Sequence, residues 1–238
     1  MNYIYFILIF FLAGITPEIT GFGVATVSMS LILFFLSPET AIPLVAMVSV
    51  FATGIIAARI KTKGILKNVV PLVFGAVFGV FLGMFFLNAA NQDVLRIFIA
   101  LFLVGYSIYG LLLRKQVFLP RNKISGGVMG LITGFFSASF NIHGPLVGIY
   151  NSADAAKNPN VYKDTVATYM FIAGLFTVFG HLVNGRITLD ILALLIYAVP
   201  AMICGLFVGN KLFNRLNGEM VKKIVYIFVL ISGIALLF

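Results

Sequence analysis

The sequence predicts an all-α, polytopic membrane protein built from two inverted repeats, each a broken or re-entrant helical hairpin followed by three transmembrane helices. The first observation is composition: the 238 residues are 61% hydrophobic and only 10% charged, with a mean hydropathy of +1.12. These values lie outside the range of soluble globular proteins. The second observation is that two apolar segments are interrupted by polar residues, glycine and proline at matching places in the two halves. The third is the distribution of basic residues among the loops.

The first half of the chain starts with an interrupted apolar segment. Two apolar runs, Tyr3–Ile15 and Val24–Leu36, are separated by the sequence Thr-Pro-Glu-Ile-Thr-Gly-Phe-Gly at 16–23. The start lacks a positively charged n-region and a small-residue cleavage site, so we expect it to be mature structure rather than a signal peptide. Three apolar runs follow, each long enough to cross about 30 Å of hydrocarbon. They are Ala41–Ala58, Val69–Leu87 and Leu95–Leu113.

The second half repeats this order. Its interrupted segment is 126–150, and we expect Gly144-Pro145 to end one helical piece and to start a second at Pro145. Proline cannot donate a backbone hydrogen bond and is favoured in the first helical turn. Further apolar runs lie near Val166–Val183, Ile191–Leu212 and Ile224–Phe238. The predicted organisation is a first membrane repeat at 1–113, a basic cytoplasmic linker at 114–125 and a second membrane repeat at 126–238.

The two halves also share a glycine pattern. Gly79 and Gly83 line up with Gly205 and Gly209 at one offset of 126 residues. An acidic and then a basic residue follows each pair at the same offset: Asp93 and Arg96 in the first half, Glu219 and Lys222 in the second. Glycine pairs let membrane helices approach closely, so we expect these at helix contacts. Chance recurrence of small residues is the alternative.

The loop charges distinguish two topologies. If both interrupted segments return to their own side as hairpins, fourteen of the 16 Lys and Arg residues lie on the cytoplasmic side and only Arg96 and Arg186 lie outside. With eight crossings the division is nine against seven. The positive-inside tendency therefore favours two hairpins and six crossings, which inverts the second half relative to the first. A bent full crossing at either segment is the alternative.

Several stretches together resemble the sulfite exporter TauE/SafE family of membrane transporters. They are the run Pro38–Val45, the basic loop into Gly64, the Gly79 and Gly83 helix, the segment His143–Tyr150 and the sequence Tyr-Lys-Asp-Thr at 162–165. The resemblance covers nearly the whole chain and implies a duplicated carrier for small sulfur-containing anions such as sulfite and organosulfonates. Many members have a run of glycines where this chain has Thr20-Gly21-Phe22-Gly23, and Gly or Asn where it has His143. The family pattern carries over to Gly21, Gly23, Gly144, Pro145 and Lys163.

The candidate substrate-binding residues lie at the two interruptions. Free N–H groups at the start of the half-helix after His143, together with the helix dipole, are suited to binding an anion. Side-chain donors that could join them are hydroxyl, amide and imidazole groups. The full predicted set is Thr20, Gly21, Gly23, Asn141, His143, Gly144, Pro145, Tyr150 and Lys163, with Ser137 and Ser139 as further hydroxyls.

Each of these side chains also has a structural interpretation. His143 could tie two helices together, the Ser and Thr hydroxyls could join helices, and Lys163 could anchor the cytoplasmic face beside Asp164. Glu18 is the candidate carrier of a coupling proton, because an ionisable group at membrane depth indicates function. His181 sits near the outer end of its run and is a weaker candidate.

The function predicted from these features is secondary transport of a small sulfur-containing anion, such as sulfite, thiosulfate or a short organosulfonate, across the cell membrane by alternating access. An anion channel of the same architecture is one alternative. An integral-membrane enzyme is another, disfavoured because the sequence has no paired-histidine spacing, cysteine cluster or nucleotide loop. We expect no metal and no cofactor. The partners expected are the anion, the lipid bilayer, a coupling proton or ion and a second copy in a homodimer, but no nucleic acid, because the basic residues lie in short loops.

Overall fold

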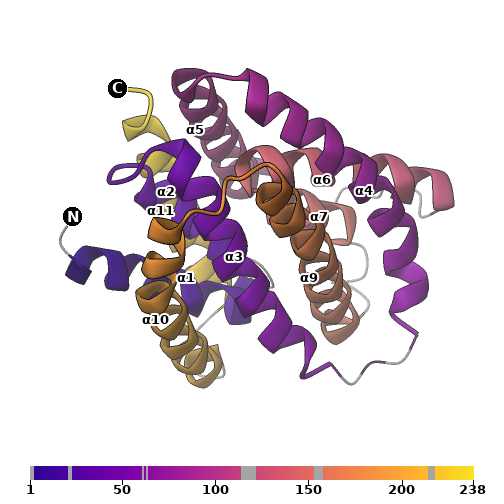
Figure 1. Ribbon diagram of the computed structural model, residues 1–238. Coiled ribbons are helices and arrows are strands. Elements are labelled where there is room, and N and C mark those ends of the chain that lie inside the picture. The colour runs from indigo at the N-terminus through magenta and orange to yellow at the C-terminus, as the bar shows by residue number, and fades with distance from the viewer. Residues whose placement is uncertain are drawn as a thin grey trace.

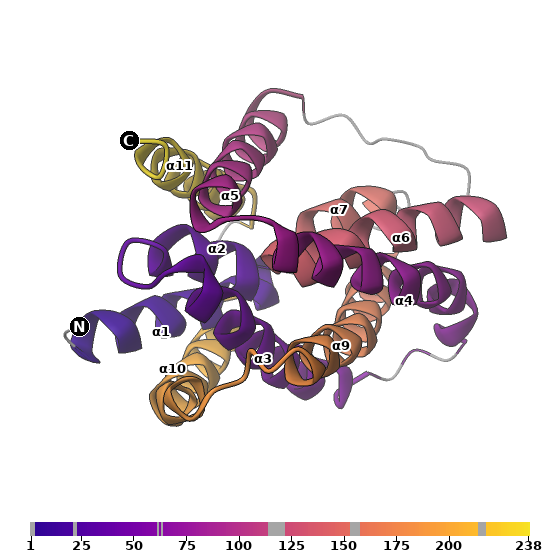
Figure 2. The same ribbon diagram turned by 45° about the horizontal axis from the view of Figure 1, so that its top comes forward.

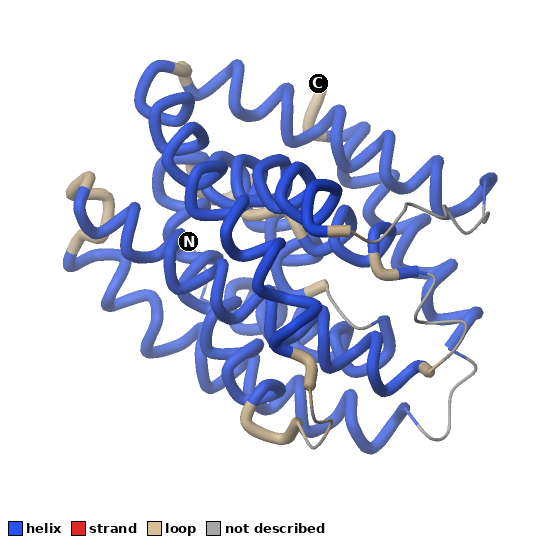
Figure 3. Tube along the Cα trace, turned by 90° about the vertical axis from the view of Figure 1, so that its right-hand side faces the viewer, coloured by secondary structure: helices blue, strands red, loops and turns tan. Residues whose placement is uncertain are grey.

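The chain folds as a bundle of helices. The computed structural model describes residues 3–20, 23–60, 62, 64–113, 122–152, 158–213 and 218–238. Of residues 3, 18–20, 113, 159, 213, 218, 219, 221 and 222 it describes the backbone alone. Within these ranges every regular element is a helix (Figures 1 and 3). The elements are α1 (Tyr3–Thr20), α2 (Val24–Ile32), α3 (Pro38–Ala57), α4 (Leu66–Ala89), α5 (Gln92–Ile108) with the π-helical turn η1 (Tyr109–Leu113), α6 (Lys123–Phe140), α7 (Gly144–Tyr150), α9 (Pro159–Val183), α10 (Leu189–Phe213) and α11 (Gly218–Ala235).

Five helical stretches of the described residues are long and apolar enough to cross a membrane. They are Pro38–Ala57, Leu66–Ala89, Gln92–Leu112, Asn160–Val183 and Leu189–Leu212. The predicted all-α membrane fold is therefore confirmed, and five of the six expected crossings correspond to helices of sufficient length and apolar composition. The sixth expected crossing corresponds to α11, whose apolar part, Lys223–Ala235, belongs to the shorter apolar helices.

The outer surface of the bundle is apolar. Along α4, Phe74, Phe78, Phe81 and Phe85 are each more than half exposed, whereas Ala76, between the first two, is buried. These phenylalanines recur every three or four residues, so they occupy one face of the helix. A contiguous apolar face of this size is unusual on a soluble monomer and is typical of contact with lipid.

The first interrupted segment breaks later than the sequence suggested. We expected the break to start at Thr16, but α1 continues through Pro17 to Thr20. Proline at position 17 removes the hydrogen bond that the Ala13 carbonyl would accept, and the Thr16 hydroxyl donates to that carbonyl at 2.8 Å instead. Membrane helices tolerate proline because a nearby Ser or Thr hydroxyl can donate to the carbonyl that the proline leaves without a backbone donor. The break ends at Gly23, whose φ of 142° favours glycine.

The second interrupted segment breaks where the sequence predicted. α6 ends at Phe140, and Asn141 follows in the left-handed conformation with φ 53°. Asparagine is one of the few non-glycine residues that adopt this conformation at a helix end. α7 then begins at Gly144 with Pro145 in its first turn, which confirms the prediction that Gly144-Pro145 starts a new helical piece.

Each broken segment turns back so that its two ends lie side by side. The ring of Tyr5, near the start of α1, stacks on the ring of Phe35, just after α2, with centroids 6.1 Å apart. In the second segment the hydroxyl oxygens of Ser125, near the start of α6, and Tyr150, at the end of α7, lie 3.3 Å apart. α1 and α6 extend toward the centre of the bundle from opposite sides (Figures 1 and 2).

Glycine faces allow the broken segments to pack directly against α4 and α10. A Cβ on Gly79 of α4 would collide with the carbonyl oxygen of Leu131 in α6, and one on Gly83 would collide with that of Phe135. Cβ atoms on Gly205 and Gly209 of α10 would collide with the carbonyl oxygens of Phe11 and Ile15 in α1. The prediction that these four glycines lie at helix contacts is confirmed.

The centre of the bundle is formed by α3 and α9, which pack against each other. α3 also contacts α10, and α9 also contacts α4, so the two central helices join the α1–α10 pair to the α4–α6 pair. α5 and α11 pack together at one edge of the bundle. Polar residues near the middle of α3 and α9 are therefore enclosed on several sides.

Candidate functional site

The two helix breaks are buried in the protein. Gly23 precedes α2 and His143 precedes α7 as the residue at the helix N-cap, and both are buried. Asn141 and His143 are each only 1% exposed. Non-helical backbone within a membrane protein is tolerable only where it is enclosed by protein or lines a cavity. The breaks meet that condition.

A hydrogen bond connects the second break to α3. The side-chain amide of Asn141 donates to the hydroxyl oxygen of Ser49 at 3.4 Å. Thr53, one turn further along α3, donates from its hydroxyl to the backbone carbonyl of Ser49 at 2.7 Å. Ser49 therefore lies at the junction between the first half of the chain and the break in the second half.

A small cavity lies between Ser49 and the first break. Its volume is about 10 Å³. Its walls come from the end of α1, the start of α2 and the middles of α3 and α9, and the lining residues are Pro17, Gly23, Val24, Ser49, Ala52, Thr53, Ile56, Ala167 and Met170. A space of this size holds about one water molecule. The hydroxyls of Ser49 and Thr53 therefore border a space that residues of both halves enclose and that is too small for a sulfur oxyanion.

A wider vestibule adjoins this small cavity. It has a volume of about 230 Å³ and shares Pro17 and Ile56 with the small cavity. The remaining lining residues are Arg59, Asn160, Lys163, Asp164 and Asn210. Pro17 and Ile56 therefore form a neck between an outer polar space and the inner polar groups.

The vestibule carries a positive balance of charge. Arg59 lies at the end of α3 with its guanidinium 5.9 Å from the centre of the Phe207 ring, within cation–π range. Lys163 lies in the first turns of α9, next to Asp164. The Thr62 hydroxyl donates to the Asp164 carboxylate. Two cations and one carboxylate leave a net positive lining, which concentrates anions.

His143 is buried without a hydrogen-bond partner. Among the described residues, neither ring nitrogen has one. Its nearest aromatic neighbour is Tyr169 of α9, whose ring lies edge-on with centroids 6.4 Å apart. A histidine that only tied two helices would be expected to use its nitrogens in hydrogen bonds, because buried polar atoms are normally paired. His143 does not line either of the two cavities described above.

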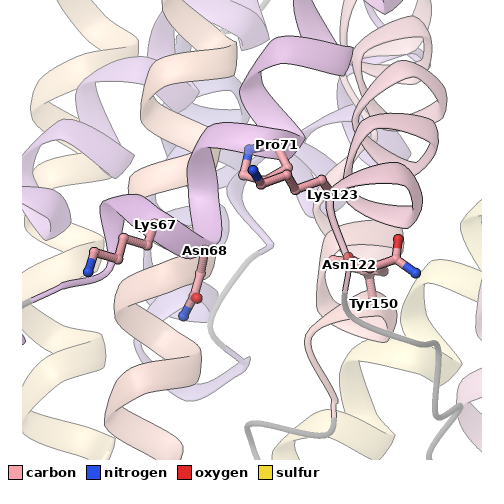
Figure 4. Close-up of a pocket in the computed structure, with 7 residues that line it drawn as sticks. Lys67, Asn68, Pro71, Asn122, Lys123 and Tyr150 are labelled. Carbon is pink, nitrogen blue, oxygen red and sulfur yellow. The ribbon is translucent and has the colours of Figure 1, made fainter.

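The other predicted site residues are distributed unevenly. Gly144 and Pro145 are buried beside His143 in the first turn of α7. Tyr150 lies at the opposite end of α7, where it lines a separate cavity with Lys67 and Lys123 (Figure 4). Gly21 lies outside the described residues, as do the side chains of Glu18 and Thr20.

Ser137 and Ser139 join helices. The hydroxyl oxygens of Ser137 and Thr177 lie 2.7 Å apart, connecting α6 with α9. Ser139 donates to the backbone carbonyl of Gly83 at 3.2 Å, which connects α6 with α4. Their structural interpretation as interhelical contacts fits these bonds.

The sequence analysis missed Ser49, Thr53 and Arg59. Ser49 and Thr53 are four residues apart in an otherwise apolar helix, so they lie on one face, and that spacing was the available signal. Arg59 was counted only among the basic loop residues. Within the described part of the chain, no group of three His, Cys, Asp or Glu residues could hold a metal ion.

Long apolar helices, an apolar outer surface and two buried helix breaks define the class: a multi-pass helical membrane protein. The family model for the sulfite exporter TauE/SafE matches residues 6–236. The chain therefore belongs to the TauE/SafE family, whose members are membrane transporters and not enzymes. None of the curated proteins and none of the solved structures matches the chain.

Proposed function

We propose that this chain is a secondary transporter that exports a small sulfur-containing anion, such as sulfite, thiosulfate or a short organosulfonate, by alternating access. The observation that carries the proposal is that the basic vestibule adjoins the small cavity beside the first break, with Pro17 and Ile56 lining both. Arg59 and Lys163 line the vestibule, and Ser49 and Gly23 line the small cavity. The rest of the bundle is mostly apolar, so these two spaces form the best-supported route for an anion.

We further propose that residues 1–113 and 126–238 are inverted repeats joined by the basic linker 114–125. The helix boundaries at the two breaks support this, because α1 ends at Thr20 and α6 ends at Phe140, while α2 begins at Val24 and α7 at Gly144. Both pairs are 120 residues apart. A two-fold relation between the halves would also exchange the α4–α6 contact with the α10–α1 contact.

The glycine contacts agree with that exchange residue by residue. The collision of Gly79 with the Leu131 carbonyl corresponds to that of Gly205 with the Phe11 carbonyl. Gly134 of α6 would collide with the Ala76 carbonyl, and Gly14 of α1 with that of Met202. In both comparisons the α4 and α10 positions differ by 126 and the α1 and α6 positions by 120.

We propose that the vestibule opens to the cytoplasm. Arg59 and Lys163 line the vestibule, and Lys67 and Lys123 line the separate cavity near the starts of α4 and α6. Arg59 and Lys67 are joined by one short loop, so these four basic residues gather at one end of the bundle. The positive-inside tendency assigns that end to the cytoplasm.

The opposite end contains Arg186, between α9 and α10. Its guanidinium donates to the Leu87 carbonyl and to the side-chain oxygen of Asn88, at the end of α4. Burial lowers the pKa of Arg186, while the nearby Glu39 carboxylate acts to raise it. Arg186 is thus engaged by its own surroundings, whereas the vestibule at the other end would receive an anion from the cytoplasm.

The proposed binding position lies beyond the neck. Gly23 and Val24, at the start of α2, line the small cavity together with Ser49. The free N–H groups of the first turn of α2 and the Ser49 hydroxyl would be the donors to an anion there. Helix N-termini of this kind bind anions in transporters. Because the cavity holds only about one water, substrate entry requires the neck at Pro17 and Ile56 to widen. We assign this structure to a closed step of the transport cycle.

Counterflow in proteoliposomes tests the proposal. Vesicles preloaded with unlabelled sulfite should accumulate labelled sulfite through a carrier, with saturable rates. Replacing Arg59 and Lys163 by glutamine should lower uptake at low substrate concentration, because the vestibule no longer concentrates the anion. A conductance far above carrier turnover, without counterflow, would instead establish an anion channel. Thiosulfate, short sulfonates and carboxylates compared in the same assay would identify the substrate.

A further inference from the structure

The separate cavity that Tyr150 lines lies away from the proposed transport route. It has a volume of about 210 Å³ and is formed where the starts of α4 and α6 meet the end of α7 (Figure 4). Its lining residues are Lys67, Asn68, Pro71, Asn122, Lys123, Gly126 and Tyr150. None of these residues lines the vestibule or the small cavity beside Ser49.

The lining of this cavity is suited to a phosphate group. Two lysines provide positive charge, and the amides of Asn68 and Asn122 provide hydrogen-bond donors and acceptors. Among the described residues, no carboxylate lines this cavity. Figure 4 shows Lys123 extending from the start of α6 toward Pro71 of α4. The Tyr150 hydroxyl lies 3.3 Å from that of Ser125, which fixes the end of α7 against α6 at this position.

An exposed apolar face begins directly beside the polar cavity. On α4, Val70 and Phe74 are 61% and 67% exposed and follow Lys67 at three and seven residues, on the same face of the helix. On α6, Ile124 and Val128 are 79% and 57% exposed. A basic cavity that borders two exposed apolar helix faces matches a molecule with an anionic head and hydrocarbon tails.

We propose that this cavity binds the phosphate headgroup of an anionic phospholipid, with the acyl chains lying along the exposed faces of α4 and α6. Basic cavities between membrane helices are suited to anionic headgroups. By the offsets of the glycine contacts, Lys67 corresponds to Ala193 and Lys123 to Tyr3 in the other half. The basic pair is therefore present at one end of the protein only, and the lipid would bind from the leaflet at that end.

Native mass spectrometry of the delipidated, detergent-solubilised protein tests the proposal. Phosphatidylglycerol and phosphatidylcholine are titrated separately against the wild type and against the double variant K67Q/K123Q. We expect the wild type to prefer phosphatidylglycerol and the double variant to bind it about 30-fold more weakly, the combined effect of two lysines near an anionic headgroup. The control K211Q/K223Q removes the same charge outside the cavity and should retain wild-type affinity.

Two further measurements locate the site and identify the ligand. Asn68→Asp, which adds a negative charge to the cavity wall, should also weaken phosphatidylglycerol binding. Val70→Asn should weaken lipid binding by disturbing the bordering apolar face, while leaving any binding of inorganic phosphate unchanged. Three outcomes would each overturn the proposal. The first is an equal loss of phosphatidylglycerol affinity in K67Q/K123Q and K211Q/K223Q, and the second is a wild type that binds phosphatidylglycerol no better than phosphatidylcholine. The third is lysine-dependent binding of inorganic phosphate that lipid does not displace. Counterflow of sulfite by K67Q/K123Q is measured in parallel, and its outcome does not enter this decision.

Discussion

The Asn141 side chain donates to the Ser49 hydroxyl oxygen across 3.4 Å, joining the break of the second half to the middle of α3 in the first. Asn141 holds a left-handed backbone conformation at the end of α6, so its position is fixed by the break itself. Ser49 lines the small cavity at the inner end of the proposed route. A movement of one half relative to the other would therefore change the surroundings of Ser49 directly, as alternating access requires.

Replacing Ser49 by alanine should weaken substrate binding by about 1 to 3 kcal/mol, the range for loss of a hydrogen bond to a charged group. The reason is that the variant loses the hydroxyl on the cavity wall while the helix is preserved. Calorimetric titration with a confirmed substrate measures the effect. Ser30→Ala provides the control, because Ser30 is also a buried serine but donates to the Val27 carbonyl within α2. Equal affinities in wild type and Ser49→Ala would remove Ser49 from the binding site.

The proposed two-fold relation makes a paired prediction about stability. Gly79→Ala and Gly205→Ala should each destabilise the protein by about 1 to 3 kcal/mol, the usual cost of an added group in a packed contact. Both new methyl groups would collide with a carbonyl oxygen of the partner helix. Gly105→Ala is the control, since a Cβ there meets nothing within 4 Å, and alanine is a better helix former than glycine. Melting temperatures in one detergent give the comparison, and a stable Gly205→Ala would break the proposed equivalence.

The parts of the fold predicted from sequence are those determined by local pattern. Apolar length located the helices from α3 to α5 and from α9 to α10, and glycine spacing located the faces of α4 and α10. The end of α1 was predicted wrongly because the compensating bond from Thr16 to Ala13 depends on helix geometry at the proline, not on composition. The small cavity could not be predicted at all. It requires Ser49 and Gly23, 26 positions apart, to line one space.

The topology makes a prediction about chemical accessibility. Single cysteines at Lys67, Lys123 and Lys211 should all be labelled from the cytoplasmic side, and one at Arg186 from the opposite side, because the basic residues gather at one end. The background for these variants is Cys204→Ser, since Cys204 is the only cysteine of the chain and is exposed. Membrane-impermeant maleimide applied to right-side-out and inverted vesicles provides the measurement. Labelling of positions 123 and 211 from different sides would exclude a hairpin at α6 and α7, because two full crossings, α9 and α10, also separate these positions.

Glu18 is the candidate carrier of a coupling proton, and its substitution separates coupling from binding. Glu18→Gln keeps the size of the side chain and removes its titration, so pH-driven transport should be abolished while substrate exchange continues. Flux with and without an imposed pH gradient is compared in the same vesicles. Asp190→Asn makes the matching carboxylate-to-amide change at the start of α10 and should leave the pH-driven flux unchanged. If the Glu18 variant still responds fully to the gradient, the coupling group lies elsewhere.

His143 provides the sharpest test of the second break. His143 is buried, and both of its ring nitrogens lack a hydrogen-bond partner among the described residues. His181, in the last turn of α9, is likewise buried and without such a partner. We expect His143→Ala to weaken substrate binding by about 1 to 3 kcal/mol, because an imidazole at the start of α7 can donate to an oxyanion that approaches the break. His181→Ala should cost similar stability through the loss of a buried ring but leave affinity unchanged. Titration of substrate against both variants, each first checked for folding in detergent, separates the two effects. Equal affinity in the two variants would mean that the His143 ring only fills space between α7 and α9.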